Sequence, residues 1–239
     1  MDEWKGLHNT KLNSPARIAK EGFYKDLSTI CIIPAIDAIP ARVVQSWLAL
    51  IHPMNQKYFP IFMIGMEVGA AYTQAIEMVL EHPEFKKWKY ILTIESDNMP
   101  PPDGLLKLYE SIEGGVDGKK YDVVGSIYWT KGEGGQPMIY GDPEVMPRNF
   151  IPQIPKFDAV QPANGLGMGF NLYRISMFKD KKFKKPWFKT CQEYEPGKGV
   201  KMYTQDLYFY EKAGSLGYKF ACDTRVKTGH YDVQNNIIW

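Results

Sequence analysis

Short apolar runs alternate with helical patterns along the first half of the chain. Uninterrupted apolar and β-branched residues predict buried strands at 28–34, 59–65 and 89–95. Between these runs, residues 41–51 and 68–81 place apolar side chains three and four positions apart, which predicts two helices. Strands and helices in this order are typical of parallel strands joined by crossover helices. We therefore expect ligands to bind beyond the carboxyl ends of the strands.

The pattern of the second half is less regular. A helix at 103–113 and a strand at 121–128 continue the alternation, and a helix at 204–215 and a strand near 218–222 follow later. Between residues 130 and 162, repeated glycine and proline exclude long regular elements, so we predict an ordered, irregular lid over a site. The predicted fold class is α/β, a single domain with a mostly parallel central sheet flanked by helices.

Composition and charge narrow the class of protein. With 239 residues, of which 44% are hydrophobic and 23% charged, the chain can bury a large core and does not match disordered, collagen-like or coiled-coil proteins. A formal charge of +2 gives no global field that would attract a polyanion. No uncharged apolar stretch reaches the roughly 18 residues of a membrane helix, and the first residues lack a signal-peptide profile. We expect a cytoplasmic protein with no membrane span.

The three cysteines, Cys31, Cys191 and Cys222, are odd in number and form no CxxC pair. Neither a disulfide framework nor a zinc knuckle is indicated. We expect reduced thiols that are mostly buried.

The sharpest chemical feature is the segment ILTIESDNMPPPDG, in which an apolar strand ends in Glu95, Ser96 and Asp97. Side chains two apart on a strand share a face, so Glu95 and Asp97 can point together into the crevice beyond the strand. Two carboxylates suit Mg²⁺ or Mn²⁺, with substrate phosphates completing the coordination. The alternative is a capped turn, in which Asp97 or Asn98 accepts hydrogen bonds from backbone amides.

Four segments in this order, STICIIPAID, ILTIESDNMPP, ANGLGMGFNLYRISMF and YTQDLYFYEKAGSLGYKFACDTRVKTGHYD, resemble glycosyltransferase family 2-like proteins of the GT-A fold. The resemblance covers roughly residues 28–231 and is weak over 130–160. It implies one GT-A domain over 1–239, with a nucleotide-binding half at 28–128 and an acceptor-side half at 129–239. The implied activity moves a sugar from a nucleotide-sugar donor, expected to be UDP-linked, to a hydroxyl acceptor on a glycan, a protein or a modified DNA base.

The resemblance also implies a metal site. The family's short acidic motif, which binds the metal and the donor diphosphate, is matched by Glu95-Ser96-Asp97, where Glu95 replaces an aspartate. His230, in KTGHYD, matches a recurrent third metal ligand, and an imidazole favours Mn²⁺ over Mg²⁺. The alternative for His230 is a polar loop residue.

Further residues match the nucleotide pocket of the family. They are Pro34, Ala35, Asp37, Gly65 and Glu67, together with Ser96 and Asp97. The alternative for Asp37 is a purely structural role as an acidic residue in the turn before Pro40. Many relatives carry Arg-Asn where this chain has Ala71-Tyr72-Thr73, which leaves the donor nucleotide open.

Asp206 matches the catalytic base of the inverting members of the family. A general base usually accelerates a reaction about 10²–10⁴-fold. The alternative follows from the helix, because Thr204 has the character of an N-cap and an acid in the first turn is favoured by the helix dipole.

The sugar and acceptor side is matched by Trp129, Asn164, Gly165, Gly167, Met168 and Gly169. Glycine at every second position lets a backbone approach a ligand closely. The alternatives are a bulged strand that binds nothing and a core position for the tryptophan.

The run KDKKFKKPWFK at 179–189 holds six lysines among Phe183, Trp187 and Phe188. Basic charge between aromatic residues is typical of proteins that bind single-stranded nucleic acid. Some virus-encoded glycosyltransferases modify a nucleic-acid base, so a viral, DNA-modifying enzyme is one alternative, and a solvated lysine-rich loop is the other interpretation of this run.

Two other functions stay open. One is a nucleotidyltransferase on a related α/β fold, although IIPAIDAIPAR lacks the glycine-rich signature of that chemistry. The other is a non-catalytic module that binds a sugar or a nucleic acid, which the substituted Glu95 and the missing Arg-Asn keep open.

Overall fold

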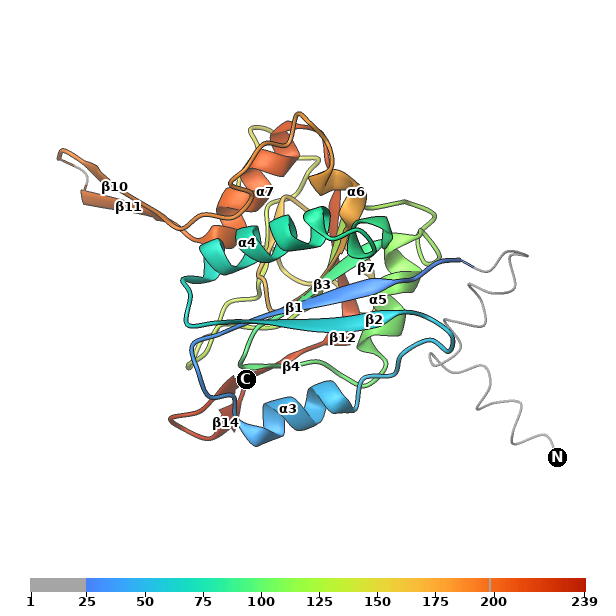
Figure 1. Cartoon of the computed structure of the whole chain (residues 1–239). Coiled ribbons are helices and arrows are strands. Elements are labelled where there is room, and N and C mark those ends of the chain that lie inside the picture. Colours follow the sequence, from blue (N-terminus) through green and yellow to red (C-terminus); the bar gives the residue numbers. More distant parts are fainter. Residues whose placement is uncertain (1–24, 198) are drawn as a thin grey trace.

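A seven-stranded sheet runs through the part of the chain that the computed structural model describes, residues 25–197 and 199–239 (Figure 1). From edge to edge its strands are β2 (Tyr58–Ile64), β1 (Thr29–Ala35), β3 (Tyr90–Ile94), β9 (Phe170–Arg174), β5 (Val123–Ile127), β12 (Phe220–Lys227) and β7 (Val160–Ala163). Five of these strands run parallel, whereas β9 and β7 run antiparallel to their neighbours. The predicted mostly parallel sheet is confirmed.

Helices cover both faces of the sheet. They are α3 (Ala41–Leu48), α4 (Val68–Glu81), α5 (Gly104–Ile112), α6 (Ile175–Phe178) and α7 (Gln205–Ser215), with a 3₁₀ turn η2 (Phe85–Lys87). Residues of α4, α6 and α7 share one buried cluster, and residues of α5 share the other. Along β1 the two clusters alternate, with Ile30 and Ile32 in the first and Cys31 and Ile33 in the second. Burial of both faces explains why this strand reads as an uninterrupted apolar run.

Small sheets complete the fold. They are β4 (Asn98–Met99) with β13 (Gly229–Asp232) and β14 (Ile237–Ile238), β6 (Ile139–Tyr140) with β8 (Gly165–Leu166), and the hairpin β10 (Cys191–Glu195) with β11 (Gly199–Tyr203). The hairpin projects away from the body in Figure 1. The expected irregular segment 130–162 therefore contains β6 and overlaps the start of β7.

Two sequence-based boundaries and one missed strand need correction. The first helix ends at Leu48 instead of residue 51, and the last strand of the main sheet extends to Lys227 instead of ending near 222. The central strand β9 was not predicted, because its sequence FNLYR follows a glycine-rich stretch that shows no strand pattern of its own.

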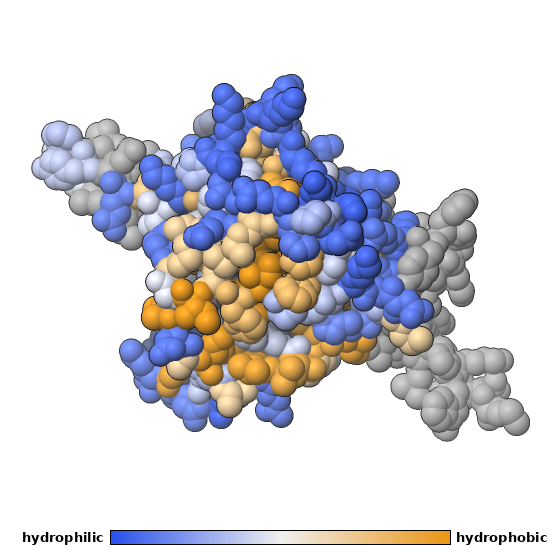
Figure 2. Space-filling view, in the orientation of Figure 1, coloured by the Kyte–Doolittle hydropathy of each residue, from blue (hydrophilic) through white to orange (hydrophobic). Residues whose placement is uncertain are grey.

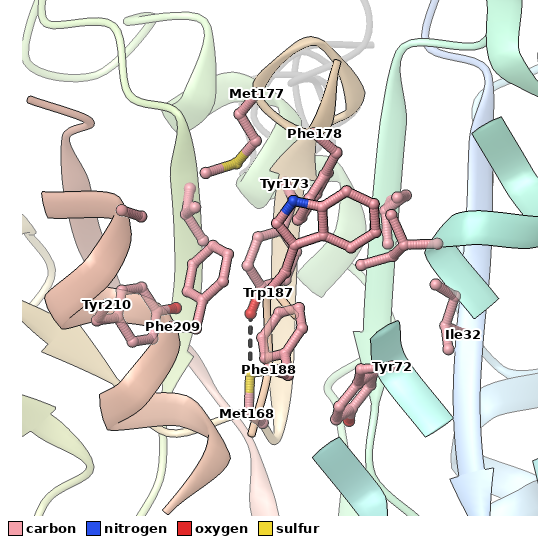
Figure 3. Close-up of a cluster of buried hydrophobic side chains, with 14 of the residues drawn as sticks. Ile32, Tyr72, Met168, Tyr173, Met177, Phe178, Trp187, Phe188, Phe209 and Tyr210 are labelled. Carbon is pink, nitrogen blue, oxygen red and sulfur yellow. Dashed lines mark hydrogen bonds between the residues drawn. The ribbon is translucent and has the colours of Figure 1, made fainter. Parts of the chain in front are cut away.

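The aromatic residues of the lysine-rich run lie in the core. Phe183, Trp187 and Phe188 are at most 3% exposed, and the Phe188 ring stacks on Phe209 of α7 with ring centroids 4.5 Å apart (Figure 3). Buried rings cannot stack on nucleic-acid bases. The prediction that these three aromatic residues form part of a nucleic-acid interface is therefore wrong. The lysines between them are exposed, as expected of a solvated loop.

Two surface findings complete the description. In the described residues no helix is both long enough and apolar enough to cross a membrane. Apolar side chains gather along the edge strand β2, where Phe59, Phe62 and Ile64 are exposed (Figure 2).

The three cysteines are free thiols, with Cys31 and Cys222 buried.

Candidate active site

A hollow of about 270 Å³ lies where β1 and β3 end. It is lined by Pro34, Ala35, Ile36, Met66, Val68, Glu95, Ser96 and Asp97. The fold brings the first strand end and the acidic motif together because β1 and β3 are parallel neighbours, with Thr29 opposite Tyr90. Parallel strands place their carboxyl ends on the same edge of a sheet, which is where ligands bind in α/β folds.

The three other residues matched to the nucleotide pocket lie outside this hollow. Asp37 is exposed beyond the strand end. Gly65 forms a turn with φ of +72°, and its N–H donates to the carbonyl of Ala35 over 2.9 Å. Glu67 is the N-cap of α4, where its carboxylate accepts hydrogen bonds from the N–H of Ala70 and the hydroxyl of Thr190, each over 2.8 Å. A helix-capping role thus accounts for Glu67.

Asp97 is held by side chains. Its Oδ1 accepts a hydrogen bond from Asn98 Nδ2 over 3.0 Å, and its Oδ2 lies 2.5 Å from Lys131 Nζ and 3.3 Å from His230 Nε2. None of these donors is the backbone amide that a capped turn would supply. Burial raises the pKa of Asp97, but the contacts with His230 and Lys131 outweigh it and bring the pKa down to about 2. The carboxylate is therefore ionised at neutral pH.

His230 is oriented by a backbone carbonyl. Its Nδ1 lies 2.8 Å from the carbonyl oxygen of Trp129, which can only accept, so Nδ1 carries a proton. Its Nε2 lies 3.3 Å from Asp97 Oδ2, where an Nε2–H donates to the carboxylate and a bare Nε2 leaves its lone pair free for a cation. A carbonyl that fixes the tautomer of a histidine is the usual outer partner of a metal-binding imidazole.

Glu95 and Asp206 lie close enough to influence one another. Burial raises the pKa of Glu95 to about 8, with further contributions from the charges of Asp97 and Asp206. Asp206 is 6% exposed, and this burial also raises its pKa. Desolvation and the charges of Asp97 and Asp206 therefore favour the protonated form of Glu95.

A divalent cation requires donor atoms that converge on it. In the described chain no three side chains among histidine, cysteine, aspartate and glutamate are placed to hold a metal ion together. His230 Nε2 and the ammonium of Lys131 nevertheless both lie against Asp97 Oδ2, so this oxygen already has a cation and an imidazole nitrogen beside it. Mg²⁺ and Mn²⁺ commonly take one or two protein ligands plus substrate phosphates. The residues fit such an open site, with Glu95 beside it.

Residues matched to the acceptor side are largely internal. Asn164 is 2% exposed and its amide donates to the carbonyl of Asn149 over 3.0 Å. Met168 is 1% exposed, and its sulfur accepts a hydrogen bond from Tyr173. Trp129 packs against the core and forms an antiparallel bridge with Pro137. These contacts are structural, and a role in sugar binding for these residues stays a prediction.

The alternating glycines make room for protein atoms. A Cβ at Gly167 would lie 2.2 Å from the hydroxyl of Tyr128, and a Cβ at Gly169 would lie 2.4 Å from Oδ1 of Asn98. A Cβ at Gly165 would lie 2.9 Å from the ring of Phe150. Close packing of the chain on itself explains all three glycines.

The sequence interpretation missed Lys131. This residue lies in the glycine-rich segment after Trp129, which carries no motif, and only the folded chain brings it to Asp97. The one signal in the sequence that could have pointed to Lys131 as a site residue is its place on a glycine-rich turn directly after the fourth predicted strand.

Comparisons with known proteins identify the fold. No protein-family model matches the chain, and no curated protein sequence matches it. Among solved structures, A197 from STIV superposes with a TM-score of 0.59 at 17% identity, covering 88% of this chain and 92% of A197. Similarity at this level of identity shows the fold alone. The chain is a single-domain α/β protein with a mainly parallel central sheet flanked by helices, consistent with a GT-A-like fold.

Proposed function

We propose that this protein is a glycosyltransferase that moves a sugar from a nucleotide-sugar donor to a hydroxyl acceptor. One observation carries the proposal: the first strand end and the acidic motif line a single hollow at the carboxyl edge of the sheet, and the buried Asp206, which does not line it, is near enough for its charge to act on Glu95. The GT-A-like fold and the four sequence segments support the same activity.

Donor binding is assigned to the hollow. Pro34 and Ala35 would contact the nucleoside, and Ser96 and Asp97 lie where the diphosphate would approach. The protonated Glu95 adds a hydrogen-bond donor without adding negative charge. A divalent cation held by Asp97 and His230 would supply Lewis-acid stabilisation of the departing diphosphate. We keep Mn²⁺ and a UDP-linked sugar as the proposed pair.

Asp206 is the proposed base. Its carboxylate would accept the proton of the acceptor hydroxyl while that oxygen forms a bond to the anomeric carbon of the sugar. The bond from the anomeric carbon to the diphosphate oxygen breaks, and the nucleoside diphosphate leaves with the electron pair. Attack opposite the leaving group inverts the anomeric centre. Burial makes Asp206 a stronger base than a free aspartate because it raises the pKa of this side chain.

Nucleotide-sugar hydrolysis tests the proposal. We would compare wild type, Asp97→Asn and Asp206→Asn with UDP-glucose, UDP-galactose and UDP-N-acetylglucosamine in the presence of Mn²⁺. Both substitutions should lower the rate, by about 10²–10⁴-fold at Asp206.

The matched control is Asp180→Asn. Asp180 follows α6 after the antiparallel strand β9, so it lies at the opposite end of the sheet from the hollow. The control should keep the wild-type rate. Equal rates in all four proteins would refute the assignment of Asp97 and Asp206, and no hydrolysis or binding of any nucleotide sugar by wild type would refute the proposed function.

A further inference from the structure

Lys131 occupies the cation position of the candidate site. Its Nζ lies 2.5 Å from Asp97 Oδ2, the same oxygen that His230 Nε2 faces. About a third of each side chain is exposed, 34% for Lys131 and 30% for Asp97. Ion pairs with this much exposure contribute about 1 kcal/mol or less, so the contact can be exchanged for another at little cost.

The base of the Lys131 turn is anchored to the site. The N–H of Thr130 donates to the carbonyl of Gln136, and the N–H of Gln136 donates to the hydroxyl of Thr130, each over 2.9 Å. The preceding residue, Trp129, holds His230 through its carbonyl oxygen. Lys131 is therefore tethered close to Asp97 and His230.

The tip of the same turn is open. Gly132 and Gly134 have φ of +101° and +73°, and a Cβ on either would have no other atom within 4 Å. Glycine at these angles needs no supporting contacts. The lysine thus sits between a fixed base and an unpacked tip, where its side chain can move without disturbing the core.

We propose that the ammonium group of Lys131, which lies on a loop, pairs with the carboxylate of Asp97 in the free protein and moves to the diphosphate when the donor binds. The proposal rests on the proposed function. A diphosphate that enters the hollow next to the ionised Asp97 needs positive charge, and Lys131 is already at that oxygen. A divalent cation that binds Asp97 would repel the ammonium from Oδ2, and the diphosphate is the anion that can then accept it.

This role predicts two effects of opposite sign when the lysine charge is removed. In the free protein Lys131→Met should bind Mn²⁺ more tightly, by about 3- to 10-fold, because the competing ammonium is gone. In the presence of Mn²⁺ the same variant should bind UDP more weakly, by about 10-fold or more, because a charge-assisted hydrogen bond to the diphosphate is lost. A residue that only supports the loop would weaken both.

Titration calorimetry with MnCl₂ alone and with UDP in saturating MnCl₂ tests the proposal. The proteins are wild type, Lys131→Met, Lys131→Arg and the control Lys156→Met, whose exposed lysine lies in the same segment 130–162. Lys131→Arg should keep most of the UDP affinity, and Lys156→Met should match wild type in both titrations.

The outcomes separate this inference from the proposed function. Wild-type UDP affinity in Lys131→Met, or weaker Mn²⁺ binding by that variant, overturns the role of Lys131 and leaves the proposed function intact. Absence of UDP binding by wild type itself, with and without Mn²⁺, overturns both. Opposite shifts in the two titrations of Lys131→Met, with partial recovery in Lys131→Arg, support the transfer of the ammonium.

Discussion

Glu95 shows how position changes the chemistry of one side chain. It ends an apolar strand, lines the hollow, and shares its surroundings with Asp97 and Asp206. Desolvation and these two charges favour its neutral form and raise its pKa to about 8. Asp97, two residues later, is ionised because Lys131 and His230 face it. Two acids of one motif therefore carry different charges at neutral pH.

Glu95→Gln should stabilise the protein at pH 8 and leave its stability near pH 5 almost unchanged. The pKa of Glu95 is above its unfolded value of about 4.3, so wild-type stability falls as the pH rises from that value through about 8. Glutamine does not titrate, and the gain at pH 8 should be about 1 kcal/mol after solvent screening. Urea unfolding of both proteins with EDTA at pH 5, 6.5, 8 and 9 measures the difference. A gain that does not grow between pH 5 and pH 8 would contradict the protonated state of Glu95.

Ionisation of Asp206 is expected to determine how kcat rises with pH on the acid side of the pH–activity profile. The base must be ionised, and burial raises the pKa of this carboxyl, so kcat should rise with pH through a value above that of a free aspartate. In Asp206→Asn this rise of kcat with pH should vanish along with most of the activity, while the unfolding temperature stays equal or rises because a buried charge is removed. A large drop in unfolding temperature would instead indicate that Asp206 serves the structure.

Among the elements, α5 is attached to the sheet by buried charges. Arg225 of β12 contacts Glu110 of α5 over 2.9 Å and Asp223 over 2.7 Å, and these side chains are 11%, 3% and 0% exposed. Asp223 also accepts a hydrogen bond from Ser111 over 2.6 Å. Removing one member of such a group leaves a buried charge without its partner.

Arg225→Met should lower the free energy of unfolding by about 3–5 kcal/mol. The control is Lys87→Met, which removes a pair with Glu84 that is more than half exposed on both sides and should cost less than about 1 kcal/mol. Urea titrations followed by circular dichroism compare the two. Equal losses would show that the network does not attach α5 to the sheet.

At the scale of the whole molecule, the donor hollow depends on segments far apart in the chain. It is lined by residues 34–36, by Met66 and Val68, and by residues 95–97, and His230 reaches Asp97 from β13 near the chain end. A ligand bound there contacts the ends of β1 and β3 and the start of α4, and it should stabilise the native state by mass action.

UDP with Mn²⁺ should raise the unfolding temperature. At 100 times its dissociation constant a ligand adds about 2.7 kcal/mol, which for a domain of this size corresponds to roughly 5–10 °C. UMP, which lacks the second phosphate, should give a smaller shift at the same concentration. Equal shifts of the unfolding temperature with UMP and UDP would show that the hollow does not contact the second phosphate.

Local patterns predicted the first three strands of the main sheet. The runs at 28–34, 59–65 and 89–95 match β1, β2 and β3 within one residue at each end. Burial on both faces leaves few polar positions in β1 and β3, whereas β2 is apolar although most of its side chains are not buried, so the prediction of a buried strand at 59–65 is wrong. The strand β9 escaped prediction, since its place between β3 and β5 depends on partners distant in sequence.

Some residues of the candidate site were likewise predictable from local sequence, and others were not. Strand-terminal Pro34, Ala35, Glu95 and Asp97 were predictable because the end of a parallel strand points to the ligand edge of a sheet. Lys131 was not, because its contact with Asp97 joins residues 34 positions apart through a turn without a motif.

The amino-acid sequence by itself determined the α/β class, the acidic strand end and the buried apolar runs, since these depend on neighbours a few positions apart. Only the tertiary structure decided that Phe183, Trp187 and Phe188 form core, that Glu95 is protonated and that Lys131 faces Asp97. Burial and charge pairing are properties of the surroundings in space, and those surroundings exist only once the distant segments have packed together.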